Sequence, residues 1–311
     1  MIGIGNNQLM KSNVPISQDG KYLLASNTNY FYRSSDSGVS WTQLTLLGSG
    51  ARDVAINSDG QYQAVCRYNA YIHTSSDYGV SWTQRYDLKN WNRIAISGTG
   101  QYILASVQDA EYLYRSTDYG ISWSQLTAVG SRDWREMDIS QTGQYQTAVA
   151  YGNYIYTSSD YGASWTARTA AGSRVWLSVA LSQTGQYQTA GLNGGYIWKS
   201  SNYGETWAIN FYSGSRYWRG ISISNTGQYQ TGSAYTGGTF RSTDYGVYWT
   251  LIDNAGSSNS FSVGLSGSGE LQIVGFYNYI PKLSTNYGAN WSLLPLSSSY
   301  WSYVAINKYI E

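Results

Sequence analysis

The chain has 311 residues, of which 12% are charged, and its 19 Lys and Arg nearly balance its 18 Asp and Glu to leave a formal net charge of +1. Such sparse and balanced charge excludes a strongly basic surface that would attract nucleic acid or an anionic membrane. One cysteine excludes an internal disulfide and a thiolate metal cluster, and one histidine leaves a histidine-based zinc site without a second ligand.

In chain order, an eight-residue segment, clearest at residues 158–165, occurs seven times. Each copy has the form Ser-x-Asp/Asn-x-Gly-x-x-Trp, and consecutive copies are 41 or 42 residues apart. The central residues are Asp36, Asp77, Asp118, Asp160, Asn202, Asp244 and Asn286. A fixed period of about 40 to 50 residues is typical of the blades of a β-propeller.

The fourth repeat shows the strands expected in each unit. We expect strands over residues 134–140, 144–150, 154–159 and 163–168, separated by turns. In the first strand, Met137 and Ile139 alternate with polar residues. This alternation predicts a large apolar face on one side of each sheet and a small face on the other, as stacked sheets require.

The repeated segment resembles the Asp-box, or BNR repeat, of sialidase-like, sortilin-like and photosystem II stability factor-like β-propellers. The resemblance extends from about residue 12 to the end of the chain. It implies an all-β fold, a single seven-bladed β-propeller over residues 1–311 with four antiparallel strands in each blade and an Asp-box in the turn between the third and fourth strands. It implies no single activity, because glycosidases, lectin-like binders, sorting receptors and assembly factors share the repeat.

Two stretches, residues 14–17 and 301–307, compete for the first strand of the first blade. Pro15 has no N–H to donate to a neighbouring strand, whereas Trp301 repeats the tryptophan of other first strands. We therefore expect residues 301–307 to close the ring.

The central acid or amide of each Asp-box is expected to accept hydrogen bonds from its own turn, while the glycine adopts a positive φ. Asn202 and Asn286 keep the acceptor without the charge. This favours a structural role over catalysis or metal binding.

In propellers, the connections that enter the first strand and those between the second and third strands share one face, here called the loop face; the Asp-box turns lie on the other, the box face. The resemblance places a functional site on the loop face. A cation precedes a tryptophan there in four repeats: Lys89/Trp91, Arg132/Trp134, Arg174/Trp176 and Arg216/Trp218. The adjoining connections carry Tyr151, Asn153, Asn193 and Tyr235. These residues either bind a glycan or acidic ligand, or pack between blades with the cation stacked on the indole.

Acidic residues on the first strands also have two interpretations. Asp53, Arg93 and Glu136 occupy one level in successive repeats, and Asp138 stands where other repeats carry Ala, Ser or Gly. One interpretation is an ion network around the channel. The other is a glycoside hydrolase site, whose candidate carboxylates are Asp138, Glu136, Asp133 and Asp109.

We expect a non-enzymatic binding propeller that recognises a glycan or a protein partner through the loop face, without a cofactor or metal. The alternatives are a glycoside hydrolase and an assembly factor resembling the photosystem II stability proteins. The composition predicts no nucleic-acid partner and no membrane insertion, and residues 1–11 lack the features of a signal peptide. The polar surface favours an extracellular or virion location, and the sequence leaves the oligomeric state open.

Overall fold

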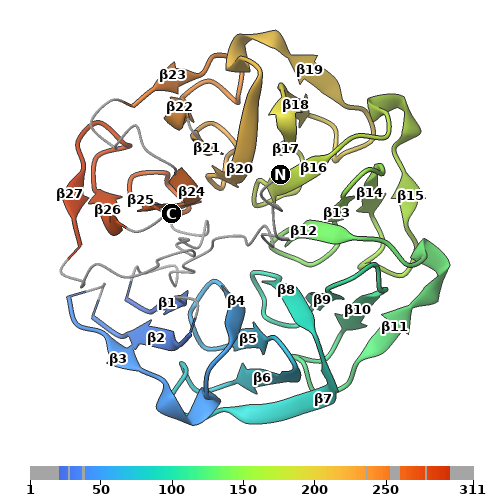
Figure 1. Cartoon of the computed structure of the whole chain (residues 1–311), viewed down its shortest axis with the longest axis vertical. Helices are drawn as coiled ribbons and strands as arrows, with labels where there is room; N and C mark the ends of the chain where they lie inside the picture. Colours follow the sequence, from blue (N-terminus) through green and yellow to red (C-terminus); the bar gives the residue numbers. More distant parts are fainter. Residues whose placement is uncertain are drawn as a thin grey trace, which may run out of the picture.

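The chain forms a β-propeller in which antiparallel sheets are arranged around a central axis (Figure 1). The computed structural model describes residues 21–26, 29–36, 39–235, 237–252, 260–276 and 279–294. The sheets run outwards from the axis, and strands such as β4, β8 and β12 lie innermost (Figure 1). The strands and short turns of a repeat therefore form a sheet that runs from the axis to the outer edge of the molecule.

The described strands form five separate sheets of three or four strands and one sheet of eight strands. The separate sheets contain β1 (Leu23–Ser26), β2 (Phe31–Ser34) and β3 (Thr42–Gln43); β4 (Ala51–Ile56), β5 (Gln63–Arg67), β6 (Ala70–Ser75) and β7 (Thr83–Lys89); β8 (Trp91–Ile96), β9 (Ile103–Val107), β10 (Leu113–Ser116) and β11 (Ser124–Leu126); β12 (Trp134–Ile139), β13 (Gln146–Ala150), β14 (Ile155–Ser158) and β15 (Thr166–Ala167); and β24 (Ser260–Leu265), β25 (Gln272–Phe276), β26 (Tyr279–Ser284) and β27 (Ser292–Leu293). The eight-stranded sheet contains β16 (Trp176–Leu181), β17 (Gln188–Gly195), β18 (Ile197–Ser200), β19 (Ala208–Asn210), β20 (Arg216–Ile223), β21 (Gln230–Tyr235), β22 (Gly238–Ser242) and β23 (Thr250–Leu251). Short 3-10 helices connect some sheets: η1 (Thr45–Leu47), η2 (Thr127–Val129), η3 (Thr169–Ala171) and η4 (Phe211–Ser213).

The prediction of a seven-bladed propeller with four strands in every blade is wrong. The finding that overturns it is the eight-stranded sheet, in which β17 pairs with β20 as well as with β16 and β18. Asn193 lies opposite Tyr217, and Gly195 lies opposite Arg216, so the ladder crosses the boundary between two repeats. Gly194 has a φ of 82°, which glycine adopts without strain and which lets this connection lie against β20.

The same boundary is crossed by single bridges elsewhere in the ring. Glu111 pairs with Arg132, and Asn153 pairs with Arg174. The N–H of Arg132 donates to the carbonyl of Glu111 at 3.1 Å, and that of Arg174 donates to Asn153 at 2.9 Å. The sequence period reveals the repeats, but the extent of pairing between them depends on the backbone path of each connection.

The first sheet contains three described strands, β1 to β3. The two stretches expected to compete for its innermost strand, residues 14–17 and 301–307, lie outside the described residues. Leu23 and Ala25 of β1 pack with Ile273 of the last sheet. The first and last sheets are therefore neighbours in the ring (Figure 1).

The sheet β12–β15 shows how a repeat packs against the one before it. Its strands lie within the ranges predicted for the fourth repeat. Met137 and Ile139 are buried against Ala95 and Leu104 of the preceding sheet. Large side chains of one sheet thus fill the space left by small side chains of its neighbour, as the alternation predicts.

Each Asp-box turn is closed by hydrogen bonds to its central residue. Oδ1 of Asp160 accepts from the Ser158 hydroxyl at 2.8 Å and from the Ser164 N–H at 2.9 Å, and Oδ2 accepts from the Ser164 hydroxyl at 2.6 Å. Asn202 accepts the equivalent hydroxyl and backbone bonds at 2.9 and 3.1 Å. An amide oxygen therefore reproduces two of the three bonds without a negative charge.

The tyrosine after the central acid joins the box to the preceding sheet. Tyr161 has a φ of 61°, in a left-handed region that bulky residues rarely adopt, and Gly162 follows with a φ of 78°. The Tyr161 ring packs on Tyr102 with ring centroids 5.0 Å apart. Equivalent pairs are Tyr22–Tyr78, Tyr62–Tyr119, Tyr145–Tyr203, Tyr187–Tyr245 and Tyr229–Tyr287. The sequence predicted a positive φ for the glycine but not for this tyrosine.

Hydrogen bonds favour the ionised form of four box acids. At Asp36, the bonds from Ser40 and Ser34 lower the pKa of the carboxyl to about 2. At Asp77, Asp118 and Asp160, burial acts to raise the pKa, but hydrogen bonds from the box serines outweigh it, and each pKa lies below its usual value. The folded chain therefore favours the charged form of these acids.

Asp160→Ala should lower the free energy of unfolding by about 1 to 3 kcal/mol, because three donors lose their acceptor. Urea denaturation measures this change. The matched control is Asp160→Asn, which should lose less than half as much, since Asn202 and Asn286 serve in the same position. Equal losses in the two variants would contradict the hydrogen-bonding role.

Acid should destabilise the chain through the same carboxylates. Because their folded pKa values are lowered, the stabilisation is present above the unfolded pKa near 4 and is lost as the pH falls through the lowered folded values, which for Asp36 is about 2. We expect the urea midpoint to fall across this window, and to fall less steeply in the triple variant Asp77→Asn, Asp118→Asn and Asp160→Asn. Identical pH profiles would refute this assignment.

Candidate functional site

Four cations on the loop face lie directly before or at the first strand of a repeat. Lys89 ends β7, Arg132 and Arg174 precede β12 and β16, and Arg216 begins β20. The start of β12 pairs with the end of β13, so each cation adjoins the connection that follows the second strand. The structure thus brings together the two sets of loop-face residues that the sequence singled out.

The tryptophans that accompany these cations are core side chains. Trp91, Trp134, Trp176 and Trp218 are each at most 1% exposed. Each meets an aromatic ring of the third strand edge-on: Trp91–Tyr114, Trp134–Tyr156, Trp176–Trp198 and Trp218–Phe240. A buried indole offers no free face, so these rings cannot stack on a sugar.

The cations stack on the same third-strand rings. The distances to the ring centroid are 5.3 Å for Lys89 on Tyr114, 4.6 Å for Arg132 on Tyr156, 4.9 Å for Arg174 on Trp198 and 4.3 Å for Arg216 on Phe240. Nε of Arg132 also donates to the Tyr156 hydroxyl at 2.5 Å, and Nε of Arg174 donates to the Ala171 carbonyl at 2.8 Å. Hydrogen bonding to Tyr114 raises the pKa of Lys89. These cations therefore cover the outer edge of each aromatic cluster.

The polar residues of the adjoining connections fall into two groups. Oδ1 of Asn153 accepts from the Tyr156 hydroxyl at 2.8 Å, and Asn193 lies in the ladder that joins β17 to β20. Tyr151 is 42% exposed, and Tyr235 is half-buried. The asparagines thus shape the connections, while the tyrosines reach the surface.

A second set of cation–aromatic contacts, which the sequence reasoning missed, lies nearer the axis. Each joins an arginine of a first strand, directly after the tryptophan position or its equivalent, to the tyrosine that ends or follows the second strand. The rim pairs are Arg52–Tyr68, Arg135–Tyr151 and Arg219–Tyr235, with guanidinium-to-centroid distances of 4.9, 4.7 and 4.8 Å. One side of each ring is covered by a guanidinium.

Co-occurrence in the sequence is the signal that could have identified the rim pairs. Arginine and tyrosine occur together in three alternate repeats. In the repeats between them, both are replaced, by Asn92 and Gln108 in one and by Leu177 and Asn193 in the other. A motif common to all seven repeats does not contain this pattern, because only three repeats carry it.

Electrostatic interactions link two of the rim pairs. Burial lowers the pKa of the Arg219 guanidinium, and the positive charge of Arg135 adds to that shift. Arg135 forms an ion pair with Asp133. The two arginines therefore lie close enough to repel, and one acid offsets part of their charge.

Asp138, the outlier of the first strands, links two sheets. It accepts through Oδ1 from the Ile139 N–H at 2.8 Å and through Oδ2 from the Leu181 N–H of the next first strand at 2.7 Å. Ser222 occupies the same position two repeats later and accepts from the Leu265 N–H at 3.1 Å. A hydroxyl and a carboxylate thus make the same contact between sheets.

The other three carboxylates considered as acid and base lie in different surroundings. Glu136 is buried and accepts a backbone hydrogen bond at 2.9 Å. Asp133 forms the ion pair with Arg135, and Asp109 is exposed in the connection after β9. Their environments do not make them a matched acid and base.

Asp53 and Arg93 also tie neighbouring first strands together. Both side chains are buried. Asp53 accepts from the Ile94 N–H of the next sheet at 3.0 Å, and Nε of Arg93 donates to the Arg135 carbonyl of the sheet after that at 3.0 Å. Each of these charged groups therefore bonds to the backbone of the following sheet.

The cysteine and the histidine of the chain lie in surroundings that suit a structural role. Burial raises the pKa of the Cys66 thiol well above its usual value, and burial lowers the pKa of His73. Within the described ranges, no three His, Cys, Asp or Glu side chains gather as metal ligands would. The described part of the chain also has no helix of the length and apolarity needed to cross a membrane.

The family model of the BNR-Asp box repeat matches residues 113–126, which span β10, the third box and β11. The chain therefore carries an Asp-box repeat within a β-propeller fold. This confirms the repeat family inferred from the eight-residue segment. No curated protein sequence matches the chain.

Several solved structures share the fold at low sequence identity. YCF48 from Cyanidioschyzon merolae has a TM-score of 0.62 at 15% identity, over 81% of this chain and 86% of that one. YCF48 bound to D1 peptide has a TM-score of 0.66 at 18% identity, over 89% and 91%. The GH74 xyloglucanase from Xanthomonas campestris has a TM-score of 0.51 at 17% identity, over 94% of this chain but 60% of the enzyme. Likeness at this level of identity shows the fold alone.

Trp134→Ala should cost about 3 to 5 kcal/mol of unfolding free energy, because it empties a fully buried site. The matched variant Tyr151→Ala removes a ring that is 42% exposed and should cost about 1 kcal/mol or less. Urea denaturation of both variants measures the difference. Comparable costs would contradict the division into core tryptophans and surface tyrosines.

Proposed function

We propose that the chain is a non-enzymatic binding protein whose loop face recognises a carboxylate-bearing segment of a protein partner. The observation that carries the proposal is the set of three rim pairs. Tyrosine and arginine are enriched at the centres of protein interfaces, where the ring supplies rigid contact area and the guanidinium binds carboxylates.

The positions of the rim pairs suit a segment that lies across the mouth of the channel. Their arginines belong to β4, β12 and β20, which surround the axis in Figure 1. Tyr68 and Tyr151 are 41% and 42% exposed, so one side of each ring is accessible while arginine covers the other. A segment that contacts two pairs at once gains affinity from weak individual contacts.

The electrostatics of the rim favour an acidic partner. The charge of Arg135 acts on Arg219, and an incoming carboxylate would relieve this repulsion. Asp133 offsets only part of the local positive charge. Binding through such contacts should weaken as the salt concentration rises.

Exposed aromatic area supports a protein rather than a glycan as partner. Phe211 of η4, which packs on Tyr196 beside the second-to-third strand connection, is 66% exposed. The tryptophans that would have stacked on sugars are buried. The solved structure of YCF48 bound to D1 peptide is a propeller of the same fold with a bound peptide, and it supports a peptide partner by analogy.

Hydrolysis is less well supported than binding. The likeness to GH74 xyloglucanases is one of fold. Asp138 and Glu136 accept backbone hydrogen bonds, which supports a structural role for both. The geometry of these carboxylates therefore does not favour glycoside hydrolysis as a second candidate function.

Selection of random peptides displayed on phage against the full chain tests the proposal. We expect enrichment of peptides that contain Asp or Glu, with affinities that fall at high salt. Arg219→Gln and Tyr151→Ala should each weaken binding of an enriched peptide about tenfold, as the loss of a charge-assisted contact or an aromatic anchor predicts. Arg115→Gln, a change on the box face, is the matched control and should bind as the wild type does.

Two results would count against this function. One is enrichment of peptides without acidic residues. The other is undiminished affinity in both rim variants. Binding on a glycan array that disappears in Tyr151→Ala would assign the same surface to a glycan instead.

A further inference from the structure

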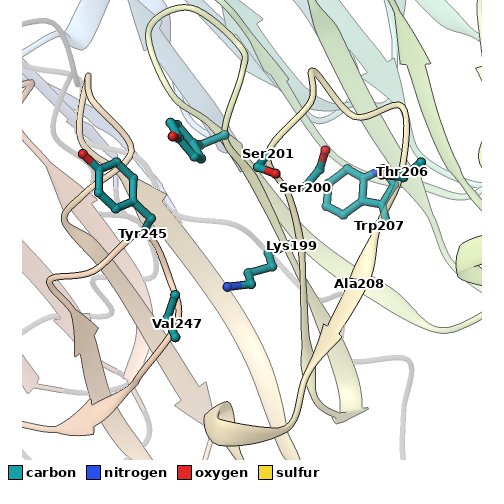
Figure 2. A pocket seen from close by; sticks show the side chains of 9 residues that line it. Lys199, Ser200, Ser201, Thr206, Trp207, Ala208, Tyr245 and Val247 are labelled. Atoms are coloured by element: carbon teal, nitrogen blue, oxygen red, sulfur yellow. The ribbon is translucent and has the colours of Figure 1, made fainter.

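A pocket of about 220 Å³ opens on the box face, between the β18–β19 hairpin and the Asp-box of the following repeat (Figure 2). Trp207 lines one side, and Tyr245 and Val247 line the other. Lys199 extends into the space between them (Figure 2). This pocket is separate from the loop face and from the rim pairs.

The pocket exists where one residue departs from a repeated contact. In three other repeats, an arginine immediately before the first box serine reaches the next box. Arg33 donates to the Tyr78 carbonyl at 2.6 Å, Arg115 to Tyr161 at 3.2 Å and Arg241 to Tyr287 at 2.9 Å. The guanidinium in these repeats therefore occupies the gap between two sheets.

Lys199 occupies the equivalent position but does not bond to the Tyr245 carbonyl. Within the described residues, its ammonium has no hydrogen bond or ion pair, and the side chain is half-buried. The two repeats are joined here instead by Asn210, whose amide donates to the Val247 carbonyl at 3.1 Å. The lysine charge is therefore available to a ligand without loss of the contact between repeats.

The charges around the pocket favour an anion. The box beside it has Asn202 as its central residue, whereas five of the seven boxes have Asp. The residues that line the pocket include no Asp or Glu. Glu205, in the same box, is exposed, and its charge acts on Arg168 of the preceding sheet. No lining carboxylate competes with a ligand for Lys199.

The shape and chemistry of the walls define the rest of the ligand. The rings of Tyr187 and Tyr245 pack at a tilt with centroids 4.9 Å apart. Trp207 faces the pocket from the other side (Figure 2). Ser201 and Thr206 supply hydroxyls. Aromatic walls with adjacent hydroxyls suit the C–H face and the hydroxyl groups of a sugar ring. The volume is below the roughly 300 to 1,000 Å³ of drug-sized sites, which limits the ligand to one ring.

We propose that this pocket binds a single acidic sugar residue, such as a uronic acid, with its carboxylate on Lys199 and its ring between Trp207 and Tyr245. The site does not depend on the function proposed for the loop face. A neutral sugar lacks the charge-assisted bond, and an acidic peptide side chain lacks a hydroxyl-bearing ring to fill the walls.

Calorimetry or ligand-observed NMR with the full chain tests the proposal, with methyl β-glucuronide as the probe and methyl β-glucoside as the neutral comparison. We expect weak binding of the glucuronide, with Kd in the millimolar range, and at least about tenfold weaker binding of the glucoside. Lys199→Gln should weaken glucuronide binding by a similar factor. Arg115→Gln, in the third repeat, should leave it unchanged.

Two further variants distinguish the effect of charge near the pocket from the effect of the pocket's volume. Lys199→Arg keeps the positive charge but should restore the contact with the Tyr245 carbonyl that Arg33, Arg115 and Arg241 make in their repeats, so it should fill the pocket and abolish binding without a loss of thermal stability. Asn202→Asp should weaken binding severalfold by adding a negative charge, while the box hydrogen bonds persist as in Asp160.

The proposal is overturned if the wild type binds neither sugar, or if it binds both equally. It is also overturned if Lys199→Gln binds the glucuronide as tightly as the wild type does. Equal or tighter binding of N-acetyl-aspartate amide would assign the pocket to an acidic protein side chain and reject a sugar ligand.

Discussion

The stability of this chain depends on contact between consecutive repeats, because no sheet of three or four short strands can bury both of its faces alone. The turns between first and second strands form a chain of backbone hydrogen bonds around the axis, including Gln141 N–H to Gln183 at 2.8 Å and Gln183 N–H to Asn225 at 3.0 Å. A buried bond from the Thr147 hydroxyl to Oε1 of Gln188, at 2.7 Å, joins second strands of neighbouring repeats. The tyrosine pairs between neighbouring sheets and the buried tryptophans add apolar contact at the same boundaries. Residues that recur in every repeat are therefore committed to holding the ring together.

Residues that are not needed to hold consecutive repeats together are found at positions where the repeats differ. The rim pairs occur in alternate repeats, and Lys199 replaces an arginine that elsewhere bridges two sheets. Each departure leaves the contacts between sheets intact, since Asn210 bonds to the following repeat beside Lys199. The two proposed sites lie on opposite faces and follow from the same principle, namely that a repeated scaffold can vary at single positions without losing its packing.

Periodicity was sufficient to predict the all-β propeller, the Asp-box turns and the strand positions of the fourth repeat, because these depend on local patterns that recur. It was insufficient for the organisation of the sheets. The ladder from β17 to β20 depends on the backbone path through Gly194, and a repeat count does not contain that information. The burial of Trp134 and its equivalents was also undetermined, because the same spacing suits a surface arc or a core cluster. Arg135 and Tyr151 lie sixteen residues apart, and only the pairing of β12 with β13 brings them together.

The central claim is that cations stacked on core rings stabilise the ring, while cations of the rim pairs bind the partner. The most direct measurement is a parallel determination of unfolding free energy and affinity for one selected acidic peptide in two double variants. Arg135→Gln with Arg219→Gln should lose most of the affinity and little stability. Arg132→Gln with Arg174→Gln should lose stability and keep most of the affinity, since these arginines lie over Tyr156 and Trp198. Similar losses of unfolding free energy and of peptide affinity in both variants would contradict the division between stabilising and binding arginines.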